Sequence, residues 1–360
     1  MKNMLADFLS FAKKLIPELK TRKPSVGLDI GNHSCKAVEL LPTKDSVEIA
    51  QLVLEPIVNA DVSSAIKKIM TKIDMQTRDV YTSVAGHGTL VRYIDMPKMS
   101  LEDARRSFSL EADKYFPFAK EQIYTDCSII NSQREDNKMS LLVAAAKKEL
   151  IDQRMKLFTE LGLDANFIGL NTIALVNAFS EFRAIQERQQ EAASGCIQDV
   201  FGILDMGDTL TTLVVFKNNV PSFTRDIFIG GRDLNRSISN VLGVSADGAE
   251  KLKVDPQDKK EGVLNASESI LNNLTSEIRL SFDYFSTEQN AQIGQLFLTG
   301  GTSSLIGIED FFKKSLDIPI EKWNPVKAFI PSAQSSENPS ADKVNQDANV
   351  FGVALGLALS

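Results

Sequence analysis

The chain carries one local design twice, and this repetition constrains its fold more than any other feature. Residues 26–40 read VGLDIGNHSCKAVEL, and residues 201–216 read FGILDMGDTLTTLVVF. In each, a β-type apolar run ends in Asp-x-Gly, small polar residues follow, and a second apolar run begins. A single hairpin of this kind is an ordinary turn, because Gly, Asn and Ser suit any tight turn. Two of them, one opening each half, predict an internally duplicated α/β fold.

Length and composition agree with two domains in one chain. At 360 residues the chain is too long for one ordinary core, and its 43% hydrophobic and 24% charged residues are typical of a soluble globular protein. The formal net charge of −7 makes a nucleic acid an unsuitable partner. Three cysteines without a CxxC pair and only two histidines argue against disulfides, a zinc site and a Ser-His-Asp triad.

Capping residues and periodicity predict the remaining elements. Ser100, with Asp103 three residues later, predicts a helix over 101–116 that ends before Pro117. A compact unit is expected to begin at Val80, and the polar run 184–195 reads as a linker between the halves. Further predictions are a helix capped by Asp61, strands over 122–130 and 140–146 with the second central in its sheet, a helix over 147–161 stopped by Gly162, and a closely packing small-residue helix in GVALGLALS.

The N-terminal residues 1–24 have a different character from the rest. Apolar residues fall on one helical face, and lysines and arginines outnumber acidic residues in an otherwise acidic protein. One reading is a helix on an anionic membrane surface through residues 1–23. The other is a helix packed on the body of the protein, ended or kinked by Pro17.

The Asp-x-Gly corners are candidates for holding phosphate. The sequence has no Walker A motif and no GxGxxG opening a helix. Without a Cβ, Gly31 and Gly207 let backbone N–H groups turn toward an anion, and Lys36 can supply a point charge. Asn32, Ser34 and Thr209 add side-chain donors, and a third corner at Gly300-Gly301 strengthens the phosphate reading.

Two aspartates occupy equivalent positions at the ends of the first strands. Asp29 and Asp205 suit magnesium, which keeps most of its waters and takes few protein ligands. The alternative is that both carboxylates only accept N–H groups of their own turns.

These segments resemble a known family. DIGNHSCK and DMGDT resemble the two phosphate loops, and LTGGTSSLIG the adenosine loop, of the actin-like ATPase superfamily. Within it, VRYIDMPKMSLEDA, EADKYFPF, LLVAAAKKELID and SEIRLSFDYF resemble the PilM family of type IV pilus assembly proteins, relatives of FtsA. The resemblance spans nearly all of residues 25–360.

The resemblance implies an actin-like ATPase fold with two duplicated lobes and ATP with Mg²⁺ between them. Lobe I would span 25–184 with an extra subdomain over 80–133 and the C-terminal helix 350–360, and lobe II would span 195–335. On the helix SEIRLSFDYF, Glu277, Arg279 and Ser281 would contact the ribose or base, with an ordinary solvated helix face as the alternative. The implied nucleotide-binding residues are Gly31, Asn32, His33, Ser34, Lys36, Gly207, Asp208, Thr209, Gly230, Gly231, Glu277, Arg279, Ser281, Gly300, Gly301 and Thr302.

The resemblance also implies a partner and a place in the cell. Members are cytoplasmic, peripheral to the inner membrane, and bind the N-terminal tail of PilN in a groove of lobe I, forming part of a ring that links to the pilus motor ATPase. The groove would involve the extra subdomain, with Arg105, Phe108, Tyr115 and Phe116 as candidate lining residues and a core role as the alternative for the phenylalanines.

The expected catalytic activity is weak. Relatives carry an acid after the strand ANFIGL, where this chain has Gly169 and Asn171. Asn171 can orient water but cannot accept its proton, which leaves Asp205 as the candidate base and predicts slow or absent ATP hydrolysis. The alternatives are an FtsA-like membrane-associated filament protein and a sugar or acid kinase of the same superfamily.

Overall fold

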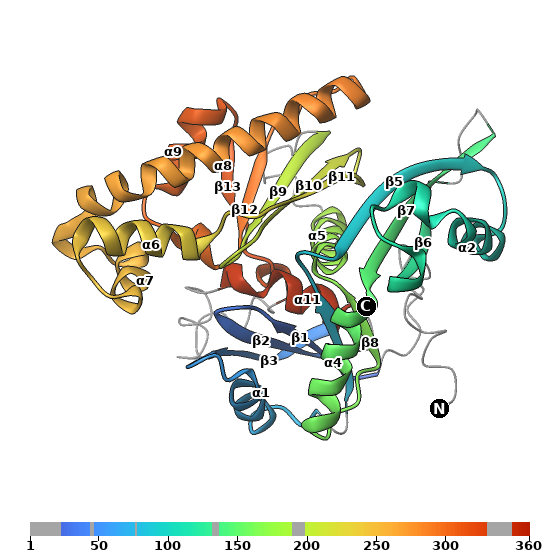
Figure 1. The fold of residues 1–360 in the computed structure, drawn as a ribbon, viewed down its shortest axis with the longest axis horizontal. Helices are drawn as coiled ribbons and strands as arrows, with labels where there is room; N and C mark the ends of the chain where they lie inside the picture. Colours follow the sequence, from blue (N-terminus) through green and yellow to red (C-terminus); the bar gives the residue numbers. More distant parts are fainter. Residues whose placement is uncertain (1–22, 44–46, 76–77, 132–136, 189–198, 330–347) are drawn as a thin grey trace. The chain divides into compact units, whose positions relative to one another are not determined.

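The computed structural model describes residues 23–43, 47–75, 78–131, 137–188, 199–329 and 348–360 (Figure 1). These residues form two compact units, each described by itself. Unit 1 holds the described residues up to Ile185, 326–329 and Val353–Ser360, and unit 2 holds the remainder. The predicted N-terminal segment, apart from residues 23–24, and most of the predicted linker lie outside the described residues. Within the described ranges, no helix has the length and apolarity needed to cross a bilayer.

The main sheet of unit 1 has the strand order β3-β2-β1-β4-β8. Its strands are β1 (Ser25–Ile30), β2 (Ser34–Pro42), β3 (Val47–Pro56), β4 (Asp79–Val84) and β8 (Phe167–Leu170). β2 pairs antiparallel with β1 and β3, and β4 pairs parallel with β1. The prediction that the compact unit begins at Val80 is wrong for this strand, because β4 is hydrogen-bonded between β1 and β8 in the main sheet.

Two helices cover one face of this sheet. α1 (Val62–Met70) begins as predicted, with the Asp61 carboxylate accepting from the Ser64 N–H at 2.9 Å. α4 (Lys148–Glu160) ends beside Gly162, whose φ of +67° suits a helix C-terminus. Their buried side chains, among them Ile66 and Phe158, pack on those of β1 and β2.

The C-terminal helix α11 (Gly352–Ala358) packs closely in unit 1, as its small residues predict. A Cβ at Gly27 of β1 would lie 1.9 Å from the Ala354 carbonyl oxygen. A Cβ at Gly356 would lie 1.7 Å from the carbonyl oxygen of Ala174 in α5 (Asn171–Arg188). Backbone therefore meets backbone at both contacts. The predicted linker from 184 is wrong at its start, since α5 continues to Arg188.

A second sheet of unit 1 has three strands between residues 89 and 147 and forms a small subdomain, so the predicted range 80–133 ends too early. β7 (Lys138–Lys147) lies between β5 (Thr89–Pro97) and β6 (Ile123–Asn131), which confirms the central position expected from its apolar faces. The helix predicted over 101–116 is instead α2 (Leu101–Leu110) and α3 (Ala112–Tyr115). Glu111 leaves helical geometry (φ −111°, ψ 15°), and this break turns Phe116 into the core beside Phe108.

Unit 2 repeats the strand order of the main sheet of unit 1. Its order is β11-β10-β9-β12-β13. The strands are β9 (Val200–Met206), β10 (Thr211–Lys217), β11 (Val220–Ile227), β12 (Leu296–Thr299) and β13 (Ile320–Lys322). As in unit 1, two antiparallel pairs are followed by parallel strands. The duplication predicted from the two Asp-x-Gly hairpins is thus present in the topology.

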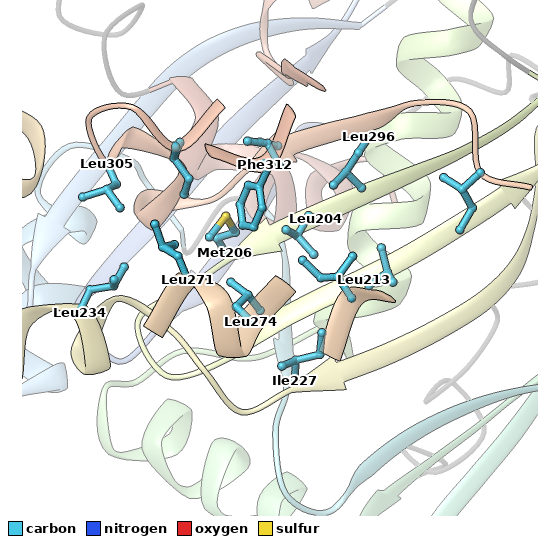
Figure 2. Close-up of a cluster of buried hydrophobic side chains, with 14 of the residues drawn as sticks. Leu204, Met206, Leu213, Ile227, Leu234, Leu271, Leu274, Leu296, Leu305 and Phe312 are labelled. Carbon is cyan, nitrogen blue, oxygen red and sulfur yellow. The ribbon is translucent and has the colours of Figure 1, made fainter. Parts of the chain in front are cut away.

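Helices α6 (Gly231–Leu242), α7 (Ala246–Val254), α8 (Lys260–Gln289) and α9 (Ile308–Leu316) complete unit 2. α8 crosses the sheet as one long helix (Figure 1). Figure 2 shows its Leu271 and Leu274 among side chains of the strands, including Leu204 and Leu213. Short 3-10 turns are η2 (Lys120–Gln122), η3 (Gln257–Lys259), η4 (Gly301–Ser304), η5 (Lys327–Phe329) and η6 (Ala348–Phe351).

Candidate functional site

The first Asp-x-Gly corner closes the β1–β2 hairpin of unit 1. The Gly31 N–H donates to the Ser34 carbonyl oxygen at 3.1 Å, and Asp29 lies opposite Lys36 across the strand pair. The Lys36 ammonium Nζ is 3.2 Å from Asp29 Oδ2, and Asp29 is only 5% exposed. The corner therefore holds its carboxylate and its ammonium as a buried pair.

The second corner, in unit 2, has the same backbone geometry. The Gly207 N–H donates to the Leu210 carbonyl oxygen at 2.9 Å, and Asp205 lies opposite Thr212. Thr212 thus takes the position that Lys36 has in unit 1. Its hydroxyl donates to Asp226 Oδ1 at 2.8 Å, while burial raises the pKa of the Asp226 carboxyl against the effect of that hydrogen bond.

Three loops of unit 2 that are far apart in sequence meet at Gly231. The Gly231 N–H donates to the Gly207 carbonyl oxygen at 3.0 Å, and the Thr302 hydroxyl donates to the same oxygen at 2.8 Å. A Cβ at Gly231 would lie 2.5 Å from Thr302 Oγ1, and one at Gly300 would lie 2.5 Å from Asp205 Oδ1. The structure therefore brings together the turn between β9 and β10, the Gly230-Gly231 corner and the Gly300-Gly301 corner.

A buried lysine that sequence reasoning missed lies at this meeting point. The Lys253 side chain is 5% exposed, and its Nζ would be 3.0 Å from a Cβ at Gly231. Nζ pairs with Glu250 Oε2 at 2.7 Å, and Glu250 also accepts from the Asn235 amide. Asn235 Oδ1 is buried without a hydrogen-bond partner. The sequence holds one indication of this burial. Lys253 follows Ala249 by four residues, so both side chains lie on the same face of α7.

The predicted adenosine contacts on α8 have partners of their own within unit 2. Glu277 forms an ion pair with Arg225 of β11, and Arg225 also donates to the Ser281 hydroxyl at 3.2 Å. Arg279 donates to the Ser315 carbonyl oxygen. An earlier turn of α8 carries Leu264, which would be 3.1 Å from a Cβ at Gly307, six residues after Gly301. Thirteen residues of helix, about 20 Å, separate Leu264 from Glu277.

The other predicted loop residues have mixed surroundings. Asn32, His33 and Gly301 are exposed, and Ser34 is buried. The Asp208 carboxylate pairs with Arg232 at 2.7 Å, and the Arg232 N–H donates to the Asp208 carbonyl oxygen. Thr209 is half-buried in the turn.

The two aspartates differ as magnesium ligands. In the described part of the chain, three or more His, Cys, Asp or Glu side chains nowhere gather as a metal site. A single carboxylate with retained waters can still hold Mg²⁺, and the half-buried Asp205 fits that chemistry. Asp29 stays a candidate from the sequence, with one of its two oxygens, Oδ2, paired with the Lys36 ammonium.

The expected partner residues divide into buried and accessible ones. Phe108 and Phe116 are 1% and 3% exposed in the core of the subdomain, so neither can line a groove as expected. Tyr115 is half-buried, and Arg105 pairs with Asp126 at 2.8 Å. Burial raises the pKa of Asp126 to about 6, opposed by the Cys127 N–H and by Arg105.

Where a catalytic acid would be expected, the chain has a fixed amide. Asn171 begins α5, and its Oδ1 accepts from the Ser83 hydroxyl of β4 at 2.7 Å. This contact holds the amide in one orientation, and no proton acceptor is present at Asn171 or Gly169.

Two sheets of one strand order, each opened by an Asp-x-Gly corner, define an α/β protein with the actin-like ATPase fold. A family model described as type IV pilus assembly protein PilM matches residues 27–360, and the chain belongs to that family. This confirms the family expected from the sequence.

Solved structures agree on the fold. A PilM-PilN type IV pilus biogenesis complex is similar with a TM-score of 0.78 at 22% identity, over 94% of this chain and 98% of that chain. Ethanolamine utilization protein EutJ from Carboxydothermus hydrogenoformans is similar with a TM-score of 0.51 at 12% identity, over 99% and 96%.

Proposed function

We propose that this PilM-family protein binds ATP and serves as an interlobe clamp or switch in the type IV pilus assembly platform. The observation that carries the proposal is the meeting of Gly207, Thr302 and Lys253 at Gly231. Glycine loops beside a buried ammonium suit a polyphosphate, because backbone and cation can both approach its oxygens. The matching corner in unit 1 is proposed to contribute Lys36 as a second cation.

The residues have separate roles in this proposal. Lys36 and the Gly31 turn bind phosphate in unit 1, and the Gly207 turn with Thr302 does so in unit 2. Lys253, Glu250 and Asn235 offer charge and hydrogen bonds to the sugar or phosphates. Magnesium, when bound, would neutralise phosphate charge, and Asp205 is the residue suited to hold it through water. Glu277, Arg279 and Ser281 stay candidates from the resemblance alone.

Hydrolysis is proposed to be slow or absent. Asn171, held by Ser83, can position water but cannot take its proton. Asp205 is the remaining candidate base. A phosphate-release assay under single-turnover conditions is expected to show turnover well below about 1 s⁻¹. Rapid phosphate release by the wild type that is lost in the Asp205→Ala variant would contradict the proposal that the bound nucleotide acts as a clamp without being hydrolysed.

The proposed partner is the N-terminal tail of the inner-membrane protein PilN, bound at the cytoplasmic face. The support is the family and the similarity to a solved PilM-PilN complex. The tail would dock on the subdomain, where Arg105 and Tyr115 are the accessible candidates. A role in a ring and a link to the motor ATPase belong to the same proposal.

A labelled synthetic peptide of that tail tests the partner by fluorescence anisotropy, with and without ATP. Binding is expected, with an affinity that changes when ATP is present. Tyr115→Ser is expected to weaken it about tenfold, which corresponds to about 1.4 kcal/mol. Tyr284→Ser, at a 57% exposed tyrosine of unit 2, is the matched control. Failure of the peptide to bind under either condition would contradict the proposal.

A further inference from the structure

We propose that Arg232 is a positioning residue of the nucleotide site, which neutralises Asp208 so that the turn between β9 and β10 can receive a phosphate. The inference deepens the proposed nucleotide function and rests on it. It gives the first turn of α6 a role that comes from a side chain and not from its backbone N–H groups.

The N–H groups that begin α6 are already engaged within unit 2. The Gly230 N–H donates to Asp233 Oδ2 at 3.0 Å, and the Gly231 N–H donates to the Gly207 carbonyl oxygen at 3.0 Å. The Arg232 N–H donates to the Asp208 carbonyl oxygen at 2.7 Å. These donors would have to give up protein partners before they could bind an anion in the way that open helix N-termini do. The turn between β9 and β10 is therefore the better place for a phosphate.

The backbone alone fixes this turn against α6. Two of the hydrogen bonds above join the turn to the helix through Gly207 and Asp208. A Cβ at Gly230 would lie 2.5 Å from the Asp208 carbonyl oxygen, so the two chain segments approach backbone to backbone. The position of the turn thus does not depend on the guanidinium of Arg232.

The side chains of the same two residues form an ion pair. Arg232 Nη2 is 2.7 Å from Asp208 Oδ2. The Asp208 side chain is 14% exposed and that of Arg232 is 55% exposed. The carboxylate is therefore poorly screened by water, and the guanidinium reaches it from the solvent side.

Other charges at this corner make the neutralisation matter. Lys253 is engaged with Glu250 at 2.7 Å, and Asp205 adds a carboxylate at the end of β9, where its Oδ1 would be 2.5 Å from a Cβ at Gly300. Acidic side chains outnumber basic ones among these contacts of the described chain. The charged side chains concerned are Asp205, Asp208, Asp233, Glu250, Arg232 and Lys253.

The consequence for a bound phosphate follows from Coulomb's law. An unpaired Asp208 carboxylate would repel a phosphate in its own turn, and the repulsion is stronger where water is largely excluded. Paired with Arg232, the carboxylate carries its counter-charge at 2.7 Å, so most of that repulsion is cancelled. Arg232 thus acts on the phosphate through Asp208.

A double-mutant cycle tests the inference by calorimetric titration of ATP into the full chain in Mg²⁺ buffer. Arg232→Gln leaves Asp208 unpaired and is expected to lose about tenfold in affinity, which corresponds to about 1.4 kcal/mol. Asp208→Asn removes the repelling charge and is expected to bind at least as tightly as the wild type. The double variant is expected to bind within about threefold of the wild type, because Arg232 then has no charge to neutralise.

The cycle distinguishes this role from two others. If the ion pair only held the turn in shape, Asp208→Asn would bind as weakly as Arg232→Gln. If Arg232 contacted the phosphate itself, the double variant would stay as weak as Arg232→Gln. Either result, or an Arg232→Gln variant that binds as tightly as the wild type, would overturn the inference while the nucleotide function stands. Absence of ATP binding to the wild type would overturn both.

Two further variants serve as controls. Arg236→Gln removes a 70% exposed guanidinium one turn along α6, which lies 3.9 Å from Asp233, and is expected to bind ATP within about twofold of the wild type. Arg232→Lys keeps the positive charge and is expected to bind more tightly than Arg232→Gln. Thermal melting of each variant checks that it folds.

Discussion

Two glycines show how far single residues determine the packing of the C-terminal helix. Gly27 and Gly356 lie where α11 meets β1 and α5, with 1.9 and 1.7 Å between their ideal Cβ positions and backbone oxygens. Backbone cannot move aside as a side-chain end can. These contacts are therefore closed to any larger residue.

Gly356→Ala is expected to lower the free energy of unfolding by about 2–3 kcal/mol, because overpacking outweighs the roughly 1 kcal/mol that alanine gains in a helix. Urea denaturation measures the change. Gly301→Ala, whose Cβ would meet nothing closer than 3.9 Å, is expected to leave stability within about 0.5 kcal/mol of the wild type. A stabilised Gly356→Ala variant would contradict the packing of α11.

The buried cysteines give a second prediction for single residues. Burial raises the pKa of both Cys35 and Cys127 to about 12, so near pH 8 about one thiol in ten thousand is a thiolate. In a Cys196→Ser background, a thiol-specific reagent is expected to label neither cysteine until guanidinium unfolds the protein. Rapid labelling of either thiol in the native protein would contradict its burial.

Variants in α7 and α8 test which of the two helices contacts the nucleotide. Lys253 of α7 lies against Gly231, whereas Glu277 of α8 is paired with Arg225 of β11. Lys253→Met is therefore expected to weaken ATP binding about tenfold, and Glu277→Gln less than about twofold. Calorimetric titration measures both, with thermal melting as the check on folding. The reverse ranking would favour the contacts implied by family resemblance.

At the scale of elements, sequence predicts best what local chemistry decides. Asp61, Gly162 and the apolar β7 were enough to place their elements, because caps and burial patterns act over a few residues. The break at Glu111 was missed, since it serves the packing of Phe116 in the core. β4 was misplaced because its partner β1 is distant in sequence.

The candidate site likewise combines features set by local sequence with features set by tertiary packing. The Asp-x-Gly turns are local, and the structure gives both the same closing hydrogen bond. Lys253, Arg225 and Arg232 were not predicted, because each reaches its partner through tertiary packing and no motif spacing marks it. Their contacts depend on distances that sequence spacing does not determine.

For the whole molecule, the repeated strand order is the main finding, because it places one Asp-x-Gly corner in each unit. The central claim is that both corners hold the same nucleotide. It predicts that damage in either unit weakens binding, and that damage in both weakens it further.

ATP titration calorimetry on Lys36→Met, Thr302→Val and the double variant tests this claim most directly. Each single variant is expected to lose about tenfold in affinity, and the double variant about a hundredfold, because the two contacts lie in different units. Undetectable binding to the wild type, or a Lys36→Met variant that binds as tightly as the wild type, would contradict it.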